Sequence, residues 1–479
     1  MFGLKHNECV GFESRWKVKK VSLVGSTQTT EYTKTDMDTN TSEKKDMQVQ
    51  TESQASAPTC QVDEEKLAAW LKKIYPSVKK ELDDNAHSRA FRGYKLSTDN
   101  SDANCRLVQT LDVSTHAKDA AVGCHVSALS WNSTNQTLGV AYTYKHNSWC
   151  YHEGVVVFYT LDHDDNLPEA PRMKLTTESC VADLRFHSVL PAIVAAGLFS
   201  GGIVVWNIQR DDEQIVAKVD GHGDGITQLS WIADINSAKL VLLASAGLDG
   251  LLSLWNFSPV EFGLSLKERH QIRSPLFPKS SELSSEEAVK KATRAITCFN
   301  FSVHSPEMFV VGTEGGWVVQ CSLLGTKKLP AGKSEEAPVL DSVFKYHQPH
   351  KGEVNSISFS PNRKDMFMTS GSDLEIRIYL IEQEDPAQVI FLKSALNCVA
   401  WVPYEERIVC GCGKNGVIEI FQLVKGKAIE KTTRDKIKTE ILTQIEINRT
   451  KSNIVAVGTE NGHVQMWRVP WALFGNMAS

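Results

Sequence analysis

The sequence Ile226-Thr227-Gln228-Leu229-Ser230-Trp231 carries apolar side chains at its first, fourth and sixth positions. The same six-residue pattern occurs seven times along the chain. Its copies are VSALSW at Val126–Trp131, VADLRF at Val181–Phe186, ITQLSW at Ile226–Trp231, ITCFNF at Ile296–Phe301, VNSISF at Val354–Phe359, LNCVAW at Leu396–Trp401 and LTQIEI at Leu442–Ile447. Recurrence at this scale indicates an array of similar supersecondary units, since each copy can form one unit of a repeat.

A second apolar run, a turn and a third apolar run follow each copy. In six copies the turn contains a pair of residues that suits a tight hairpin, namely Ser200-Gly201, Asp249-Gly250, Glu314-Gly315, Asp373-Leu374, Asn415-Gly416 or Asn461-Gly462. Five residues after the second member of each pair comes a large side chain: Trp206, Trp255, Gln320, Tyr379, Phe421 or Trp467. This constant offset predicts the register of the third strand.

Three strands and a weaker fourth, such as Ala387–Lys393, make one four-stranded sheet. A single such sheet cannot bury both of its faces, so the sheets are expected to stack radially into a ring. We therefore predict an all-β protein, a seven-bladed β-propeller over residues 105–470, with residues 471–479 as a tail. Closure of the ring requires a strand from elsewhere in the chain, and Arg106–Val113 is the best candidate.

Two connections are longer than the others. The first copy has an extended tip, Lys145–Gly154, which contains His146, Cys150 and His152. The longest spacing between copies includes Glu268–Arg294, a segment rich in Ser, Pro, Glu and Lys that we predict to be a surface excursion.

The composition is that of a soluble protein. The chain has 479 residues, of which 42% are hydrophobic and 23% charged, and its formal net charge of −5 includes no basic block for nucleic acid. The first residues are charged and do not resemble a secretory signal, and no apolar run is long enough to predict insertion into a membrane. The eleven cysteines are scattered, mostly within apolar runs, which favours buried, reduced thiols in an intracellular compartment.

Three stretches carry a resemblance to a known family. They are Ser130–Thr134 (SWNST), Gly197–Gly201 (GLFSG) and Gly312–Gly316 (GTEGG), the last leading to Cys321-Ser322-Leu323. Together they resemble the WD-repeat dynein intermediate chains, in particular that of the intraflagellar-transport motor, cytoplasmic dynein 2. The resemblance covers roughly residues 48 to 469. The chain departs from the family in its first 45 residues and at Pro76, which interrupts a helix expected to be continuous. Its only Gly-His before a first strand is Gly221-His222, which indicates a divergent WD-repeat ring.

The resemblance implies a non-catalytic scaffold of a microtubule motor complex. Its propeller would bind the dynein heavy chain, and its N-terminal arm would bind dynein light chains, in the cytoplasm, cytoskeleton and cilium, including the axoneme and basal body, for retrograde intraflagellar transport and cilium assembly. The alternative is a WD-repeat adaptor of another complex, such as a ubiquitin-ligase substrate receptor. Light-chain motifs in the arm would have no purpose in that alternative.

Residues 1–61 are predicted to form a disordered arm, because much of this region is rich in Ser, Thr, Asp and Lys. Two segments in it, Thr27-Gln28-Thr29 and Val49-Gln50-Thr51, look like recognition peptides for the eight-kilodalton dynein light chain, which binds such a peptide as an added strand. A dimeric light chain would also capture a second intermediate chain. The alternative is that Gln-Thr pairs arise by chance in a Thr-rich linker.

Residues 62–85 are predicted to form an amphipathic helix after the N-cap Asp63. Its apolar face has helical spacing and comprises Leu67, Leu71, Ile74, Val78 and Leu82, with Trp70 beside it. Pro76 is expected to kink this face or to start a second turn. The resemblance implies that Leu67, Trp70, Leu71, Ile74 and Val78 bind a light chain of the roadblock type; the alternative is that the helix packs on its own propeller.

No set of residues predicts catalysis, a cofactor or a metal site. Gly221-His222 sits where WD repeats have a structural histidine, and Cys410 and Cys412 alternate within a strand, so their thiols are expected to share a sheet face. His146, Cys150 and His152 could bind zinc only with a fourth ligand, which the sequence does not suggest. Phe199 and Trp317, aromatic residues beside the inter-strand turns, are weak candidates for contact with the heavy chain, and the alternative is that they pack between blades.

Overall fold

The structure is a computed structural model of the chain, which comprises two compact units, residues 1–96 and 97–479. It describes residues 64–87, 105–112, 123–144, 146, 150, 152–210, 214–258, 263–273, 275, 294–329, 337–403, 405–423, 427–431, 440–451, 453–471 and 474. The first unit contributes one described helix, α1 (Glu64–His87), and the second unit contributes the strands.

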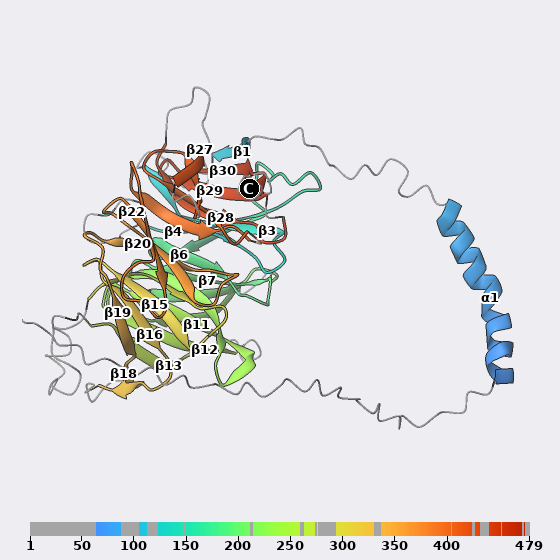
Figure 1. Ribbon diagram of the computed structural model, residues 1–479, viewed down its shortest axis with the longest axis horizontal. Helices are drawn as coiled ribbons and strands as arrows, with labels where there is room; N and C mark the ends of the chain where they lie inside the picture. Colours follow the sequence, from blue (N-terminus) through green and yellow to red (C-terminus); the bar gives the residue numbers. More distant parts are fainter. Residues whose placement is uncertain are drawn as a thin grey trace, which may run out of the picture. The chain divides into compact units, whose positions relative to one another are not determined.

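The strands of the second unit form seven sheets, which confirms the predicted seven-bladed β-propeller (Figure 1). Blades 1 to 3 are built from β2 (Cys124–Trp131), β3 (Thr137–Tyr144), β4 (Gly154–Thr160) and β5 (Met173–Thr177); β6 (Val181–Phe186), β7 (Ile193–Leu198), β8 (Gly202–Asn207) and β9 (Ile215–Asp220); and β10 (Ile226–Asp234), β11 (Ser237–Gly247), β12 (Leu251–Ser258) and β13 (Gly263–Gln271).

Blades 4 to 6 continue the same order around the ring. They comprise β14 (Ile296–Phe301), β15 (Met308–Thr313), β16 (Val318–Ser322) and β19 (Val343–His347); β20 (Val354–Phe359), β21 (Met366–Gly371), β22 (Glu375–Leu380) and β23 (Gln388–Phe391); and β24 (Leu396–Trp401), β25 (Ile408–Gly413), β26 (Ile418–Gln422) and β27 (Lys427–Lys431). Each of the seven copies of the sequence pattern lies in the first strand of a blade.

The last blade is closed by a strand from the start of the unit. It contains β28 (Leu442–Ile447), β29 (Ile454–Thr459) and β30 (His463–Arg468), and β1 (Arg106–Asp112) pairs antiparallel with β30. In Figure 1 these strands lie next to one another. The predicted closing strand is therefore confirmed, and the ring is joined by residues from both ends of the unit.

Neighbouring blades are also joined by hydrogen bonds from the second position of the repeated pattern. The side chain at that position donates to the carbonyl at the first position of the next blade's pattern. Five such bonds are present: Ser127 to Val181, Thr297 to Val354, Asn355 to Leu396, Asn397 to Leu442, and Thr443 to Val126, with lengths of 2.6–2.7 Å. The last one crosses the point where the ring closes.

The aromatic residue at the sixth position of the pattern packs between blades. Trp231 donates from its indole nitrogen to the carbonyl of Arg185 at 3.0 Å, and Trp401 donates in the same way to Ser358. Each bond links one blade to the one before it. These two tryptophans thus bury apolar surface and satisfy their polar nitrogen at the same time, whereas the buried indole nitrogen of Trp131 has no hydrogen-bond partner among the described residues.

One hairpin has a different register from the prediction. The turn residue with positive φ in β15–β16 is Gly316, not Gly315, and its equivalents are Gly201, Gly250, Leu374, Gly416 and Gly462. Cys321, and not Gln320, therefore pairs with Phe309 in the position that Trp206 and Trp255 occupy in their blades. The sequence GTEGG holds two adjacent glycines, so residue type alone could not distinguish the two registers.

The predicted excursion at Glu268–Arg294 is wrong at its start. Glu268–Gln271 belongs to β13, whose end pairs in parallel with β18 (Val339–Asp341) through Arg269 and His270. A short strand, β17 (Lys327–Lys328), pairs with β18, so a hairpin from the next blade's connection extends blade 3 to six strands. Buried Arg273 forms an ion pair with Asp341 at this junction. Residues 274 and 276–293 lie outside the described residues.

Candidate functional site

Among the described residues, His222 and His350 are buried histidines whose Nδ1 lies at hydrogen-bonding distance from an aspartate carboxylate. His222 lies with its Nδ1 3.0 Å from Asp249 and its Nε2 2.8 Å from the Ser245 hydroxyl, which also accepts a bond of 2.9 Å from Trp255. The Asp249 carboxylate accepts a further bond from the backbone of Gly223. These hydrogen bonds connect the link between blades 2 and 3 to the hairpin turn between β11 and β12. This is the structural role expected for His222.

A second histidine, His350, has a similar environment, and this role was not predicted from the sequence. His350 Nδ1 lies 2.9 Å from Asp373 and its Nε2 lies 2.7 Å from Thr369. Burial lowers the pKa of His350. Pro349 takes the place of the glycine that would have marked this position, but the spacing from His350 to Val354 matches that from His222 to Ile226.

His350, Asp373 and Glu375 are close enough to be considered as metal ligands. However, Arg377 lies 3.6 Å from Asp373 and 2.7 Å from Glu375, so a guanidinium already neutralises these carboxylates. Burial acts to raise the pKa of Asp373, but the hydrogen bonds from His350 and from the backbone of Lys351 outweigh it and lower the pKa. The cluster is a hydrogen-bonded brace, not a cation site.

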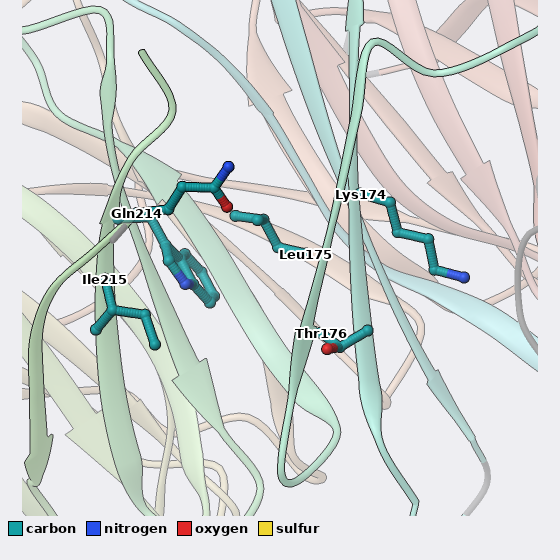
Figure 2. A pocket seen from close by; sticks show the side chains of 6 residues that line it. Lys174, Leu175, Thr176, Gln214 and Ile215 are labelled. Atoms are coloured by element: carbon teal, nitrogen blue, oxygen red, sulfur yellow. The ribbon is translucent and has the colours of Figure 1, made fainter. Parts of the chain in front are cut away.

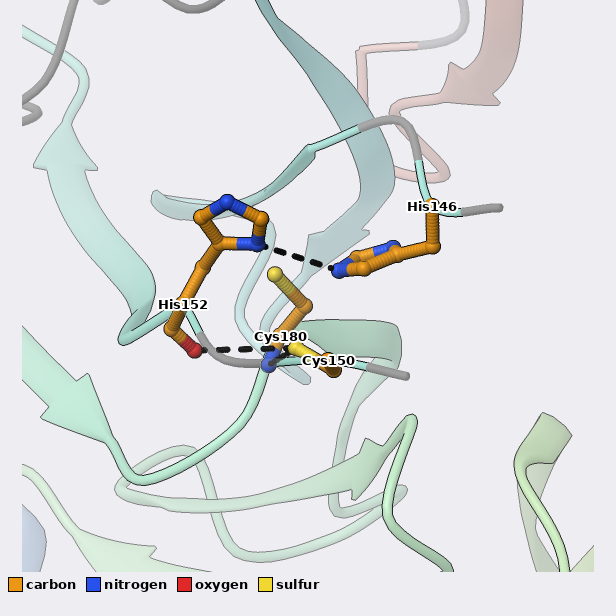
Figure 3. A group of neighbouring side chains, drawn as sticks. All are labelled: His146, Cys150, His152 and Cys180. Atoms are coloured by element: carbon orange, nitrogen blue, oxygen red, sulfur yellow. Dashed lines mark hydrogen bonds between the residues drawn. The ribbon is translucent and has the colours of Figure 1, made fainter. Parts of the chain in front are cut away.

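The extended tip of blade 1 brings histidine and cysteine side chains together. His146, Cys150 and His152 lie in the connection between β3 and β4, and Cys180 is the last residue before β6. One potential ligand atom from each of these four side chains lies within 4.8 Å of the others. The structure therefore supplies the fourth side chain that the sequence did not suggest (Figure 3).

Phe199 and Trp317 lie at inter-strand turns, as expected, but both are half-buried. Phe199 stacks on His146 with ring centroids 4.5 Å apart, and it packs against the core of blade 1. Trp317 packs against Tyr346 with ring centroids 6.4 Å apart. Each ring therefore has only part of its surface exposed.

The helix of the N-terminal unit leaves its apolar side chains uncovered within that unit. Leu67, Trp70, Leu71 and Val78 are 43%, 55%, 51% and 46% exposed, and Ile74 is half-buried. The helix α1 runs through Pro76 over 24 residues, so the expected interruption of the helix is wrong, whereas the expected kink stays a prediction. A proline removes one backbone donor from a helix, and the turns on either side of it still supply theirs. None of the described helices is long and apolar enough to cross a membrane.

Two further predictions concern the light-chain motifs of the arm and the cysteine pair of β25. The arm residues Thr27, Gln28, Thr29, Val49, Gln50 and Thr51 lie outside the described residues. Cys410 and Cys412 share one face of β25 in a single apolar cluster, and both are fully buried, as predicted. Burial raises the pKa of both thiols, so they are poor nucleophiles.

An open hollow of about 560 Å³ lies between the outer strands of blades 1 and 2 (Figure 2). It is lined by Lys174, Leu175, Thr176, Trp206, Gln214 and Ile215. Ile215 is 56% exposed there. The lining offers apolar contact, one amide and one ammonium group, a combination suited to binding a surface and not to acid–base chemistry.

These features define a WD-repeat β-propeller: seven blades, a ring closed by an early strand, and His–Asp braces between blades. The profile of the WD domain, G-beta repeat, family matches residues 213–256 and 341–379, which contain Asp249 and His350 with their braces. The match covers parts of blades 3 and 5 and confirms that the chain contains WD repeats.

The chain is similar to dynein intermediate chains. Cytoplasmic dynein 2 intermediate chain 2 of Homo sapiens is 28% identical over 422 residues, which cover 86% of this chain and 77% of that protein. The protein of the same name from Mus musculus is 28% identical over 89% of this chain and 81% of its own length. Dynein intermediate chain 2, ciliary, of Heliocidaris crassispina is 25% identical over 71% of this chain and 46% of its own length. The predicted resemblance to WD-repeat dynein intermediate chains, in particular to that of cytoplasmic dynein 2, is thus confirmed.

Proposed function

We propose that this chain is a non-catalytic intermediate chain of cytoplasmic dynein 2, in which the propeller binds the motor heavy chain and the N-terminal arm binds light chains. The observation that carries the proposal is similarity to two cytoplasmic dynein 2 intermediate chains over more than four-fifths of this chain. The role would be retrograde intraflagellar transport and cilium assembly, with the protein located at the cytoskeleton and in the cilium, including the axoneme and basal body.

The helix α1 supports the light-chain part of the proposal. Leu67, Trp70 and Leu71 are each at least 43% exposed, and together they form one apolar face. A helix that displays such a face normally buries it against a partner. A roadblock-type light chain is the proposed partner, and the alternative is burial against the chain's own propeller.

Co-purification from ciliated cells tests the function as a whole. Recovery of a dynein heavy chain and light chains with the full-length protein is expected. Recovery of a cullin adaptor in their place would favour the alternative, a ubiquitin-ligase substrate receptor, and would contradict the motor assignment.

Variants of the arm test the two peptide motifs separately. Changing Gln50 and Thr51 to Ala is expected to weaken association with the eight-kilodalton light chain more than changing Gln28 and Thr29, because the second motif is the better match. A dimeric light chain that also held a second intermediate chain would raise apparent affinity by about 10²–10⁴-fold through avidity. Undiminished binding by both double variants would mean that the arm serves only as a linker.

Variants of the propeller turns test the heavy-chain contact. Replacing Phe199 and Trp317 with Ser is expected to reduce heavy-chain binding. The matched control replaces Phe344 and Phe391, which are 71% and 78% exposed on the outer strands β19 and β23. Equal binding by the two double variants and the unmodified chain would remove the two turns from the interface.

A further inference from the structure

The tip of blade 1 brings together two thiols and two imidazoles from segments about thirty residues apart in the chain. Cys150 and Cys180 supply the sulfur atoms, and His146 and His152 supply the ring nitrogens. Figure 3 shows the four side chains pointing into one small space. Two thiolates and two imidazoles are the ligand set of many structural zinc sites, and zinc prefers four such ligands in a tetrahedron.

The distance between the two imidazoles fits a shared metal ion. His152 Nδ1 and His146 Nε2 lie 3.4 Å apart. Zinc–nitrogen bonds of about 2.0–2.1 Å in a regular tetrahedron place two nitrogen ligands about 3.3–3.4 Å apart. Cys180 is fully buried, whereas the other three side chains are half-buried. The cluster therefore has an inner ligand and a side open to solvent, through which an ion can enter.

The surrounding residues hold the ligands in place. Tyr144 stacks on His152 and Phe199 stacks on His146, each with ring centroids 4.5 Å apart. The backbone N–H of Cys180 donates to the sulfur of Cys150 at 3.3 Å. Such a bond favours the thiolate, which is the form that binds metal. Contacts that orient metal ligands in this way are typical of metal sites.

Two other interpretations use only part of the cluster. A hydrogen bond between the imidazoles accounts for the His146–His152 distance but gives the thiols no role. A disulfide between Cys150 and Cys180 gives the imidazoles no role. The pair Cys410 and Cys412 offers a comparison, because these thiols are also adjacent but belong to no cluster of potential ligands in the described part of the chain.

We propose that His146, Cys150, His152 and Cys180 form a structural Zn²⁺ site that fastens the tip of blade 1 to the link between blades 1 and 2. Four protein ligands complete the coordination of zinc, so the site stabilises structure and leaves no open position for catalysis. The ion would also fix the ring of Phe199 through its stacking on His146. This inference is independent of the proposed motor function.

The test measures metal in the purified full-length protein. Protein expressed with zinc in the medium and dialysed is expected to retain about one zinc ion per chain by elemental analysis. The variants Cys150→Ser and His152→Gln are expected to lose it. Two control variants, Cys105→Ser and His304→Gln, change the same residue types elsewhere in the propeller and are expected to retain it. Zinc-free wild-type protein, or equal zinc content in all five proteins, would overturn the proposal.

Melting curves and a cobalt spectrum give readouts that do not depend on the variants being stable. Chelation is expected to lower the melting temperature of the wild-type protein by at least about 2–4 °C, and not that of any folded Cys150→Ser or His152→Gln variant. Wild-type protein loaded with Co²⁺ is expected to show the intense visible bands of a tetrahedral site and thiolate charge transfer. A spectrum without these features, or a Cys150–Cys180 disulfide found by peptide mass in protein kept under reducing conditions, would contradict the site.

Discussion

Thr443 donates a hydrogen bond of 2.7 Å to the carbonyl of Val126, a residue 317 positions earlier in the chain. The two residues occupy the second and first positions of the repeated pattern in blades 7 and 1. The same pair of positions is joined at four other boundaries between blades. The boundary at which the ring closes is thus built in the same way as four of the six boundaries between consecutive blades.

Replacing Thr443 with Val is expected to destabilise the propeller by about 0.5–1.5 kcal/mol, because the shape is kept and one hydrogen bond is lost. The carbonyl of Val126 remains in place and loses its hydrogen-bond donor, which adds to the cost. Thermal or denaturant unfolding measures the effect. The control is Thr227→Val, since Thr227 bonds at 3.2 Å to Ala246 within its own blade. A Thr443→Val protein as stable as the wild type would show that this bond does not support closure.

His187 makes the stability of the ring sensitive to acid. Burial lowers its pKa to about 4, and its Nδ1 accepts hydrogen bonds of 3.0 Å from the backbone of Val189 and Leu190. An ordinary histidine, as in the unfolded chain, has a pKa near 6.5. Between these values the unfolded chain binds the proton more readily, so stability is fully present above about pH 6.5 and falls as the pH drops towards 4.

Unfolding measured from pH 7 to pH 5 tests this coupling. At pH 5 the contribution of His187 amounts to a loss of about 1–2 kcal/mol. His187→Asn retains an acceptor and does not titrate, so its stability is expected to fall less over this range. His347, whose pKa burial also lowers to about 4, remains in both proteins and leaves part of the slope. His304→Asn, which changes an exposed histidine, is the control. If the unfolding free energy of His187→Asn falls with pH as steeply as that of the wild type, protonation of His187 is not the cause of the acid sensitivity.

The propeller could be predicted from the sequence because its repeats are set by local patterning. All seven first strands lie where the pattern VSALSW or its equivalents occur, and Arg106–Asp112 closes the ring as expected. The second position of that pattern carries a hydroxyl or amide in six of the seven copies. Five of these six side chains donate to the next blade, but the prediction used only the apolar positions of the pattern and did not include these bonds.

The cluster at blade 1 could not be predicted in this way. His146, Cys150 and His152 are close in sequence, but Cys180 joins them only because β4 and β5 return the chain to the same end of the blade. The register error at Gly315 has a different origin, since two adjacent glycines satisfy the same turn. The fourth cluster residue was missed because it is distant in sequence, and the turn register was wrong because either of two adjacent glycines could occupy the turn.

Gly462 has a φ of +78° in the turn between β29 and β30. A β-branched side chain strongly resists this conformation. Gly462→Val is therefore expected to destabilise the propeller by about 1–3 kcal/mol. A melting curve that matches that of the wild type would contradict the positive φ at this turn. Gly263, which does not have positive φ and has open space around it, provides the matched glycine control.

Leu374 occupies the same turn position in blade 5 and is the one residue of this set that is not glycine, with a φ of +66°. A leucine held in this region costs about 1–2 kcal/mol, and its side chain is 39% exposed and so has little packing to lose. Glycine relieves the strain but adds about 0.5–1 kcal/mol of backbone entropy to the unfolded chain. The balance predicts that Leu374→Gly stabilises the propeller by about 0.5–1 kcal/mol, the opposite sign to Gly462→Val at the equivalent position. Parallel unfolding curves of the two variants measure both signs. A loss of stability in Leu374→Gly would mean that contacts of the leucine side chain outweigh the strain of its backbone.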